Sequence, residues 1–294
     1  MMVRQVLAFL PLALAIPGSV FCQDSGVTFV GRYSASYENL GQVHRLDPAI
    51  GYRFGARFAI TAGVPFYFVR SSAGLGTSGS TTANGIGNVY LNLRFAADNP
   101  AVDYWSVATV TAPTGDKSKG LSTGRVTIDW TNTFSREVGR VTPFVSLGVA
   151  NAISDAPFWV RPFSSLGLNA HAEAGGLLRT WGPTSIGASG YAVLPAGSQT
   201  VYSRIVPRGN EMTSGGQGAG KSGASRKPVF ETGSSTVGNS QIARDRGFSA
   251  WFSVSPGRYV NFILLYTHST LYSLDSVSTG LGVNLGLLTK IGRL

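Results

Sequence analysis

A long alternation of apolar with small or polar residues, from Pro48 to Phe68, constrains the fold of this chain more than any other feature. Every second residue is apolar up to Phe54, residues 55–56 supply a turn, and the alternation resumes at Phe58. A period of two places successive side chains on opposite faces of a strand. The segment therefore predicts a β-hairpin with two possible settings. Its greasy face covers a protein core while its small face meets water, or its greasy face meets lipid while its small face lines a lumen.

About twelve alternating segments follow one another along the chain, each close to the roughly nine to eleven residues of a tilted membrane-spanning strand. The connections between them alternate in length. Long connections are expected at 38–47, 70–84, 114–124, 152–163, 196–246 and 269–275, and short ones at 55–56, 97–101, 137–139, 180–183 and 256–258. Outer-membrane barrels show this parity, with tight turns in the periplasm and loops outside. A soluble β-sandwich has no reason to sort its loops in this way.

The alternation of long and short connections indicates that the apolar faces of the strands meet lipid, and so does a charged fraction of only 13%. The sequence predicts an all-β fold, a single antiparallel transmembrane up-and-down β-barrel of about twelve strands. Its longest extracellular loop, 196–246, lies between the ninth and tenth predicted strands. In the opening hairpin the lumen then receives Arg53 and Thr61, and the residues expected to face lipid are Ile50, Tyr52, Phe54, Phe58, Ile60, Val64 and Phe66.

The N-terminus has the pattern of a secretory signal peptide over residues 1–22. Arg4 precedes an apolar stretch, and a cleavage site follows at Cys22. The expected mature domain, 23–294, is then an outer-membrane barrel of a Gram-negative-type bacterium without any cysteine. Within it, the Ser- and Gly-rich segment 196–246 is expected to be flexible, with disorder at least over 213–225.

The formal net charge of +10 raises the question of an anionic partner. Nucleic acid does not fit, because the basic residues are scattered and the chain is exported. We expect contact with outer-membrane lipid and the phosphates of lipopolysaccharide, together with small-molecule solutes.

Motifs for cofactors, metals or catalysis are weak. His44, His171 and His268 lack metal-ligand spacing, and the glycine cluster 215–220 lacks the spacing of a phosphate loop, so no cofactor or metal is predicted. Outer-membrane phospholipases place a Ser/His pair on a barrel of this size. His268 and Ser269 are adjacent in a predicted strand and point to opposite faces, which argues against an enzyme.

The inward-facing residues form the candidate functional site. The residues expected to line the lumen are Arg32, Arg53, Tyr67, Arg94, Arg125, Asp129, His171 and Glu173. An arginine-lined lumen concentrates anions. Alternatively, the arginines pair with Asp129, Glu173 and carbonyl groups and plug the barrel. His171 and Glu173 lie two residues apart on one face, as a proton-sensitive pair or as part of a polar network filling the lumen.

Several short segments resemble one known family. They are Gly85–Phe95, Ala112–Asp116, Gly139–Phe144, Asp245–Ser249 and Asp275–Gly280. The chain is similar here to the outer-membrane proteins named for the meta-pathway of phenol degradation. The resemblance implies a twelve-stranded outer-membrane barrel that passes hydrophobic or aromatic compounds, and it implies no catalytic residues. The chain departs from the usual barrel pattern at its end, since residues 290–294 contain no terminal aromatic.

Three functional hypotheses follow, in decreasing order of support. The first is a passive channel or transporter for small solutes, with aromatic or hydrophobic compounds as candidates. The second is a structural or surface-binding barrel that transports nothing. The third is an outer-membrane barrel hydrolase.

Overall fold

The computed structural model describes residues 25–38, 41–71, 81–97, 99–153, 155, 158–206, 228–256 and 260–284. The predictions for the signal peptide 1–22, the glycine cluster 215–220 and the terminal residues 290–294 lie outside these described residues.

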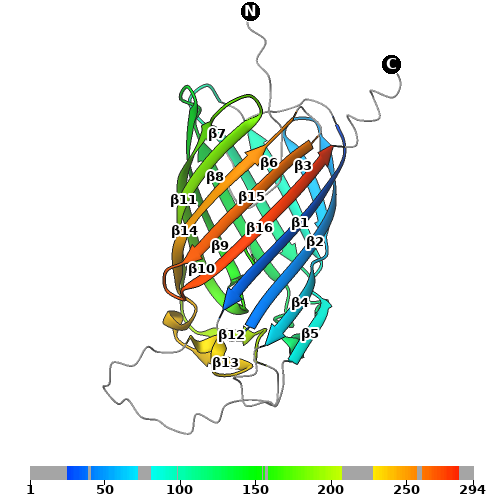
Figure 1. The fold of residues 1–294 in the computed structure, drawn as a ribbon, viewed down its shortest axis with the longest axis vertical. Helices are drawn as coiled ribbons and strands as arrows, with labels where there is room; N and C mark the ends of the chain where they lie inside the picture. The colour runs from blue at the N-terminus through cyan, green and yellow to red at the C-terminus, as the bar shows by residue number, and fades with distance from the viewer. Residues whose placement is uncertain are drawn as a thin grey trace, which may run out of the picture.

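The described strands form one antiparallel sheet that closes into a barrel, because β1 pairs with β2 on one side and with β16 on the other (Figure 1). The strands are β1 (Gly26–Glu38), β2 (Gly41–Phe54), β3 (Phe58–Gly63), β4 (Phe66–Ser71), β5 (Thr81–Ile86), β6 (Tyr90–Ala97), β7 (Asp103–Thr111), β8 (Thr127–Ser135), β9 (Val141–Ile153), β10 (Phe163–Arg179), β11 (Thr184–Pro195), β12 (Gln199–Ser203), β13 (Ser235–Gly238), β14 (Asp245–Val254), β15 (Val260–Ser269) and β16 (Leu274–Asn284). Three short 3-10 helices accompany them: η2 (Lys117–Lys119), η3 (Val229–Glu231) and η4 (Ser240–Ile242).

The wall of the barrel has twelve strands, as predicted, because β3 and β4 are two parts of one strand and β5 and β6 two parts of another. Both β3 and β4 pair with β2 in the same register, and the break falls at Val64 and Pro65. Pro48 and Pro65 lack an N–H, so the ladder loses donors there. The backbone N–H of Gly87, in the interruption between β5 and β6, donates to Pro65 O at 2.7 Å.

The apolar face of the opening hairpin is on the outside of the barrel, as predicted. Ile50 and Phe58 are 59% and 55% exposed, whereas Arg53 and Thr61 on the other face are 6% and 4% exposed. The same alternation continues around the wall, for example on β6, where Leu91 and Leu93 face outward and Asn92 is buried inside. The barrel is therefore apolar outside and largely polar inside.

The two ends of the barrel differ. At one end, here called the turn end, short connections such as 55–57, 136–140 and 180–183 join the strands. The first residues of β1 and the last of β16 also lie there, since Thr28 pairs with Asn284. The other end, the loop end, carries the connections 112–126, 154–162 and 196–244. The predicted long connections are found at 112–126, 154–162 and 196–244, but the connections expected at 38–47, 70–84 and 269–275 are shorter.

The predicted loop 38–47 is the first of these corrections. β1 runs to Glu38 and β2 starts at Gly41, which places Arg45 and Asp47 inside the barrel on a strand. Charged residues facing inward and polar residues facing outward had hidden the alternation. Likewise, residues 70–71 and 81–84 of the predicted loop 70–84 belong to β4 and β5, which pair as a hairpin that extends past the barrel wall (Figure 1).

The segment 196–246 was expected to be irregular, and its described parts contain regular structure. β12 pairs with the first residues of β10 and with β13. The reason is that β10 starts at Phe163, beyond the wall, and so offers a free edge to β12. Phe163, Phe230 and Tyr272 pack ring against ring, with centroids 5.0 to 5.5 Å apart. The intervening residues 207–227, which include the whole stretch 213–225 expected to be disordered, lie outside the described residues. Among the described residues, no helix is long and apolar enough to cross a membrane.

Candidate functional site: the lumenal cavity

The connection between β9 and β10 turns into the barrel rather than away from it. Phe158 is fully buried and lies in one apolar cluster with Ile263, on the inner face of β15. A Cβ at Gly280 of β16 would lie only 2.4 Å from Phe158 Cε1, so the ring rests directly on that glycine. The Ser278 hydroxyl donates a hydrogen bond to the Phe158 carbonyl. The connection therefore spans the lumen to strands that neighbour neither β9 nor β10.

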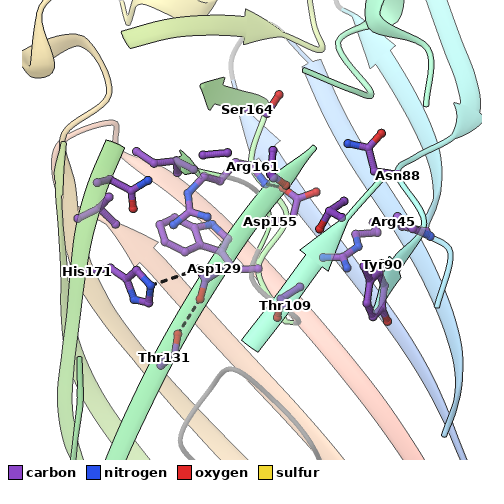
Figure 2. A pocket seen from close by; sticks show the side chains of 18 of the residues that line it. Arg45, Asn88, Tyr90, Thr109, Asp129, Thr131, Asp155, Arg161, Ser164 and His171 are labelled. Atoms are coloured by element: carbon purple, nitrogen blue, oxygen red, sulfur yellow. Dashed lines mark hydrogen bonds and ion pairs between the residues drawn. The ribbon is translucent and has the colours of Figure 1, made fainter. Parts of the chain in front are cut away.

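Beside this inward segment lies a cavity of about 220 Å³ (Figure 2). Its lining combines arginines, carboxylates, hydroxyl groups and aromatic rings drawn from most of the barrel wall. The lining side chains used below are Arg32, Arg45, Tyr67, Tyr90, Asp129, Asp155, Trp159, Arg161, Ser164, His171, Glu173, Tyr191 and Arg204.

Asp155 joins three parts of the chain at the loop end of this cavity. Its carboxylate accepts hydrogen bonds from Arg204 Nη1 at 2.7 and 2.9 Å and from the Tyr67 hydroxyl at 2.5 Å. The backbone N–H of Arg161 donates to it at 2.8 Å. Burial alone would raise the pKa of Asp155, but the charges of Arg204 and Arg45, together with these hydrogen bonds, hold the pKa below its ordinary value.

An apolar cluster adjoins this junction. Val160 of the inward segment packs with Leu121 from the β7–β8 connection and with Ile205 and Val206, which follow β12. These side chains rest on Val43 and Val69 of the barrel wall, and all of them are buried, as is Tyr67 in the same cluster. The loop end of the cavity is thus covered by three chain segments that pack against one another.

One side of the cavity is basic. Asp47 accepts from Arg45 at 2.6 Å, from Arg32 at 2.8 Å and from the Tyr90 hydroxyl at 2.9 Å, and Arg32 also donates to Tyr90. Each of these four side chains is buried. The Asp47 carboxylate therefore pairs with two guanidinium groups, that of Arg32 on β1 and that of Arg45 on β2.

The side formed by β8 and β10 is acidic. Asp129 Oδ2 lies 3.2 Å from His171 Nε2, and the Thr131 hydroxyl donates to Asp129 Oδ1 at 2.8 Å. The Ser189 hydroxyl donates to Glu173 Oε1 at 2.5 Å. Figure 2 shows Asp129 and His171 on the opposite side of the cavity from Arg45 and Tyr90.

Toward the turn end the lumen contains an apolar cluster beside inward-facing polar side chains such as Thr133 and Ser146. Phe144 and Trp251 lie near the turn ends of β9 and β14, with ring centroids 6.1 Å apart. Leu177 and Ile263 complete the same cluster, which continues to Phe158. A solute crossing the barrel would pass from the cavity alongside this apolar cluster.

The residues predicted to line the lumen are found in three settings. Those that line the cavity are Arg32, Tyr67, Asp129, His171 and Glu173. Arg53 and Arg94 lie on the inner faces of β2 and β6, outside the cavity lining, and both interact with other groups. Arg125 is exposed, and β8 starts only at Thr127, so the alternation that was expected to turn it inward does not apply.

Sequence reasoning missed several residues of the site. Arg45 and Asp47 were assigned to a loop, and Asp155, Arg161 and Arg204 belong to connections whose inward course no local pattern indicates. One signal was available. The apolar run 158–160 is unusual for a connection that meets water, and it is buried because the connection enters the barrel.

Both His171 and His268 have a carboxylate partner. His171 faces Asp129 inside the barrel, and on the outer face His268 Nδ1 lies 2.8 Å from Asp275 Oδ1. The Tyr266 hydroxyl donates to the same Asp275 oxygen at 2.5 Å. Among the described residues, no hydrogen bond joins a serine or threonine hydroxyl to either ring. Nor does the described part of the chain contain a group of three or more side chains suited to bind a metal ion.

Comparison with solved structures identifies the fold. A crystal structure of an outer membrane channel from Pseudomonas putida F1 matches with a TM-score of 0.54 at 11% sequence identity, covering 90% of this chain and 96% of that one. The β domain of the Bordetella autotransporter BrkA matches with a TM-score of 0.41 at 10% identity, covering 89% and 99%. No protein-family model and no curated protein sequence gives a significant match to the chain.

Proposed function

We propose that this protein is an outer-membrane channel that admits small solutes passively through the lumenal cavity, and that the described conformation is a closed one. The observation that carries the proposal is a closed barrel, apolar outside, that encloses a cavity of about 220 Å³ instead of a packed core at its centre. The fold it shares with the Pseudomonas putida channel supports this function.

The membrane setting rests on the outer surface. Large apolar side chains are exposed on every wall strand, for example Trp130 at 51% on β8 and Leu147 at 51% on β9. A soluble monomer does not expose apolar area on this scale, whereas the lipid face of an outer-membrane barrel requires it. The signal peptide pattern and the parity of the connections support the same location, with the turn end in the periplasm.

Aromatic or hydrophobic compounds are the candidate solutes. Tyr67, Tyr90, Trp159 and Tyr191 contribute rings to the cavity, and an apolar cluster lies beyond it. The resemblance to the phenol meta-pathway family points to the same chemistry.

We infer a separate contact on the outer side of the barrel. Exposed Arg70 and Arg246, at the loop ends of β4 and β14, would bind lipopolysaccharide phosphates.

A structural or surface-binding barrel that transports nothing is the second candidate. The buried Asp155 junction and the contact of Phe158 with the far wall favour it, because together they obstruct the lumen. The two candidates differ in whether the inward segment can move.

Planar-bilayer recording of the refolded mature protein separates them. We expect discrete channel openings in the wild type, and larger or more frequent openings when the Asp155 junction is removed. Absence of conductance and of solute flux in both proteins, with barrel circular dichroism intact, would contradict the channel proposal and favour the second candidate.

A further inference from the structure

We propose that the lumenal cavity is a selective site for a small aromatic acid that also carries a hydrogen-bond donor, that is, a hydroxy- or amino-substituted aromatic carboxylate. The inference rests on the proposed channel function and specifies the class of solute. It is carried by an unequal distribution of charge across the cavity.

The basic side has more guanidinium groups than carboxylates. Asp47 lies between Arg32 and Arg45, and the nearby Asp155 is bound by Arg204, so three cations face two anions. All five side chains are buried or nearly so, and buried charges are screened little by solvent. An incoming carboxylate would balance this excess and accept charge-assisted hydrogen bonds.

The acidic side has the opposite excess. Asp129 and Glu173 both face the cavity. His171 Nε2 lies 3.2 Å from Asp129, and the hydroxyl groups of Thr131 and Ser189 donate to Asp129 and Glu173. Carboxylate oxygens accept more than one hydrogen bond. A hydroxyl or amino group on the solute would therefore find acceptors on β8 and β10, across the cavity from Arg45 (Figure 2).

The cavity lining also includes aromatic rings and the donor groups of Trp159 and Ser164. Arg161 Cζ stacks 3.7 Å from the centre of the Trp159 ring. Trp159 and Ser164 are each 4% exposed, and Trp159 Nε1 and Ser164 Oγ have no hydrogen-bond partner within the described structure. A buried donor without an acceptor is costly, and an oxygen of a bound solute would satisfy it.

The size of the cavity sets the scale of the solute. A dry protein cavity of about 150 Å³ holds a benzene molecule. The present 220 Å³ therefore accommodates one ring with one or two small substituents. A neutral hydrocarbon of that size would leave both charged sides of the cavity without a partner, which disfavours its binding.

The test is calorimetric titration of the refolded full mature protein in detergent with 4-hydroxybenzoate, benzoate and phenol. We expect 4-hydroxybenzoate to bind roughly ten-fold or more tightly than either compound that lacks one of its two polar groups. Asp129→Asn should remove the preference over benzoate while keeping the preference over phenol. Arg45→Gln should remove the preference over phenol while keeping the preference over benzoate. Arg125→Gln, at an exposed position outside the cavity, is the matched control and should change neither preference.

Arg45→Gln disturbs a buried ion pair, so Arg45→Lys provides a second variant that keeps the charge but not the planar fork and should weaken 4-hydroxybenzoate binding less. Equal affinities for the three compounds, or no binding of any of them by a protein that conducts, would overturn this inference and leave the channel proposal standing. A protein that binds 4-hydroxybenzoate selectively but never conducts would instead contradict the channel proposal while supporting the site.

Discussion

Asp155 and Arg204, 49 residues apart in the sequence, form a buried ion pair in which one guanidinium nitrogen donates to both carboxylate oxygens at 2.7 and 2.9 Å. Through this pair the inward β9–β10 connection is tied to the segment that follows β12. Tyr67 of β4 donates to the same carboxylate, so the junction is also tied to the barrel wall. The first two predictions concern this junction.

Asp155→Asn should open the channel. The change removes the charge that Arg204 requires, and breaking a buried pair by removing one partner costs about 3 kcal/mol or more of local stability. We expect a several-fold increase in open probability in planar-bilayer recordings. Asp116→Asn serves as the control, because Asp116 is an exposed residue of the β7–β8 connection and its carboxylate contacts Ser118 and Lys119 of the same connection. Wild-type conductance in Asp155→Asn would show that the junction does not hold the lumen closed.

The closed state should weaken in acid. Because the pKa of Asp155 is depressed in the folded protein, the junction contributes its full stability above the unfolded value, about 3.9. That contribution is lost as the pH falls through the lower folded value. We therefore expect channel opening to rise only below about pH 4, and to be insensitive to pH there in Asp155→Asn. An equal acid response in the variant would assign the effect to other carboxylates.

Gly280→Ala should have the same effect as Phe158→Ala. The added Cβ would lie 2.4 Å from Phe158 Cε1, so the ring must leave its place on the wall. Each variant should increase conductance. The double variant should show little further increase, because both substitutions remove one contact. Fully additive effects in the recordings would mean that the two residues act independently.

Ile50→Asp should impair assembly far more than Thr61→Asp. The two residues lie on the paired strands β2 and β3 at nearly the same depth, but Ile50 is 59% exposed on the outer face and Thr61 faces inward. Lys or Arg on the lipid face costs about 2–4 kcal/mol at the bilayer midplane, and Asp costs less but is still destabilising. Folding into vesicles, followed by the gel mobility of the folded barrel, measures the difference. Equal folding yields would contradict the assignment of the two faces.

The sequence by itself determined the class of fold, the number of wall strands and the direction that most strand residues face. These properties follow from a local period of two and from the spacing of the connections, which any stretch of chain carries within itself. The hairpin around residues 55–56 is the clearest instance, since its outer and inner rows are found as predicted. The prediction of a loop was wrong at 41–47, which belongs to β2. Charged residues face the lumen there and polar residues face outward, so the apolar alternation disappears.

Only the tertiary structure decided what fills the lumen. The pairing of Asp47 with Tyr90, of Asp129 with His171 and of Asp155 with Arg204 joins residues on different strands and connections. Such contacts exist because closing the barrel turns these side chains toward a common interior, and no local pattern encodes which of them meet. For the same reason the inward course of Phe158 and the separation of basic and acidic sides could not be predicted. Local periodicity determines the wall, whereas closure determines the site.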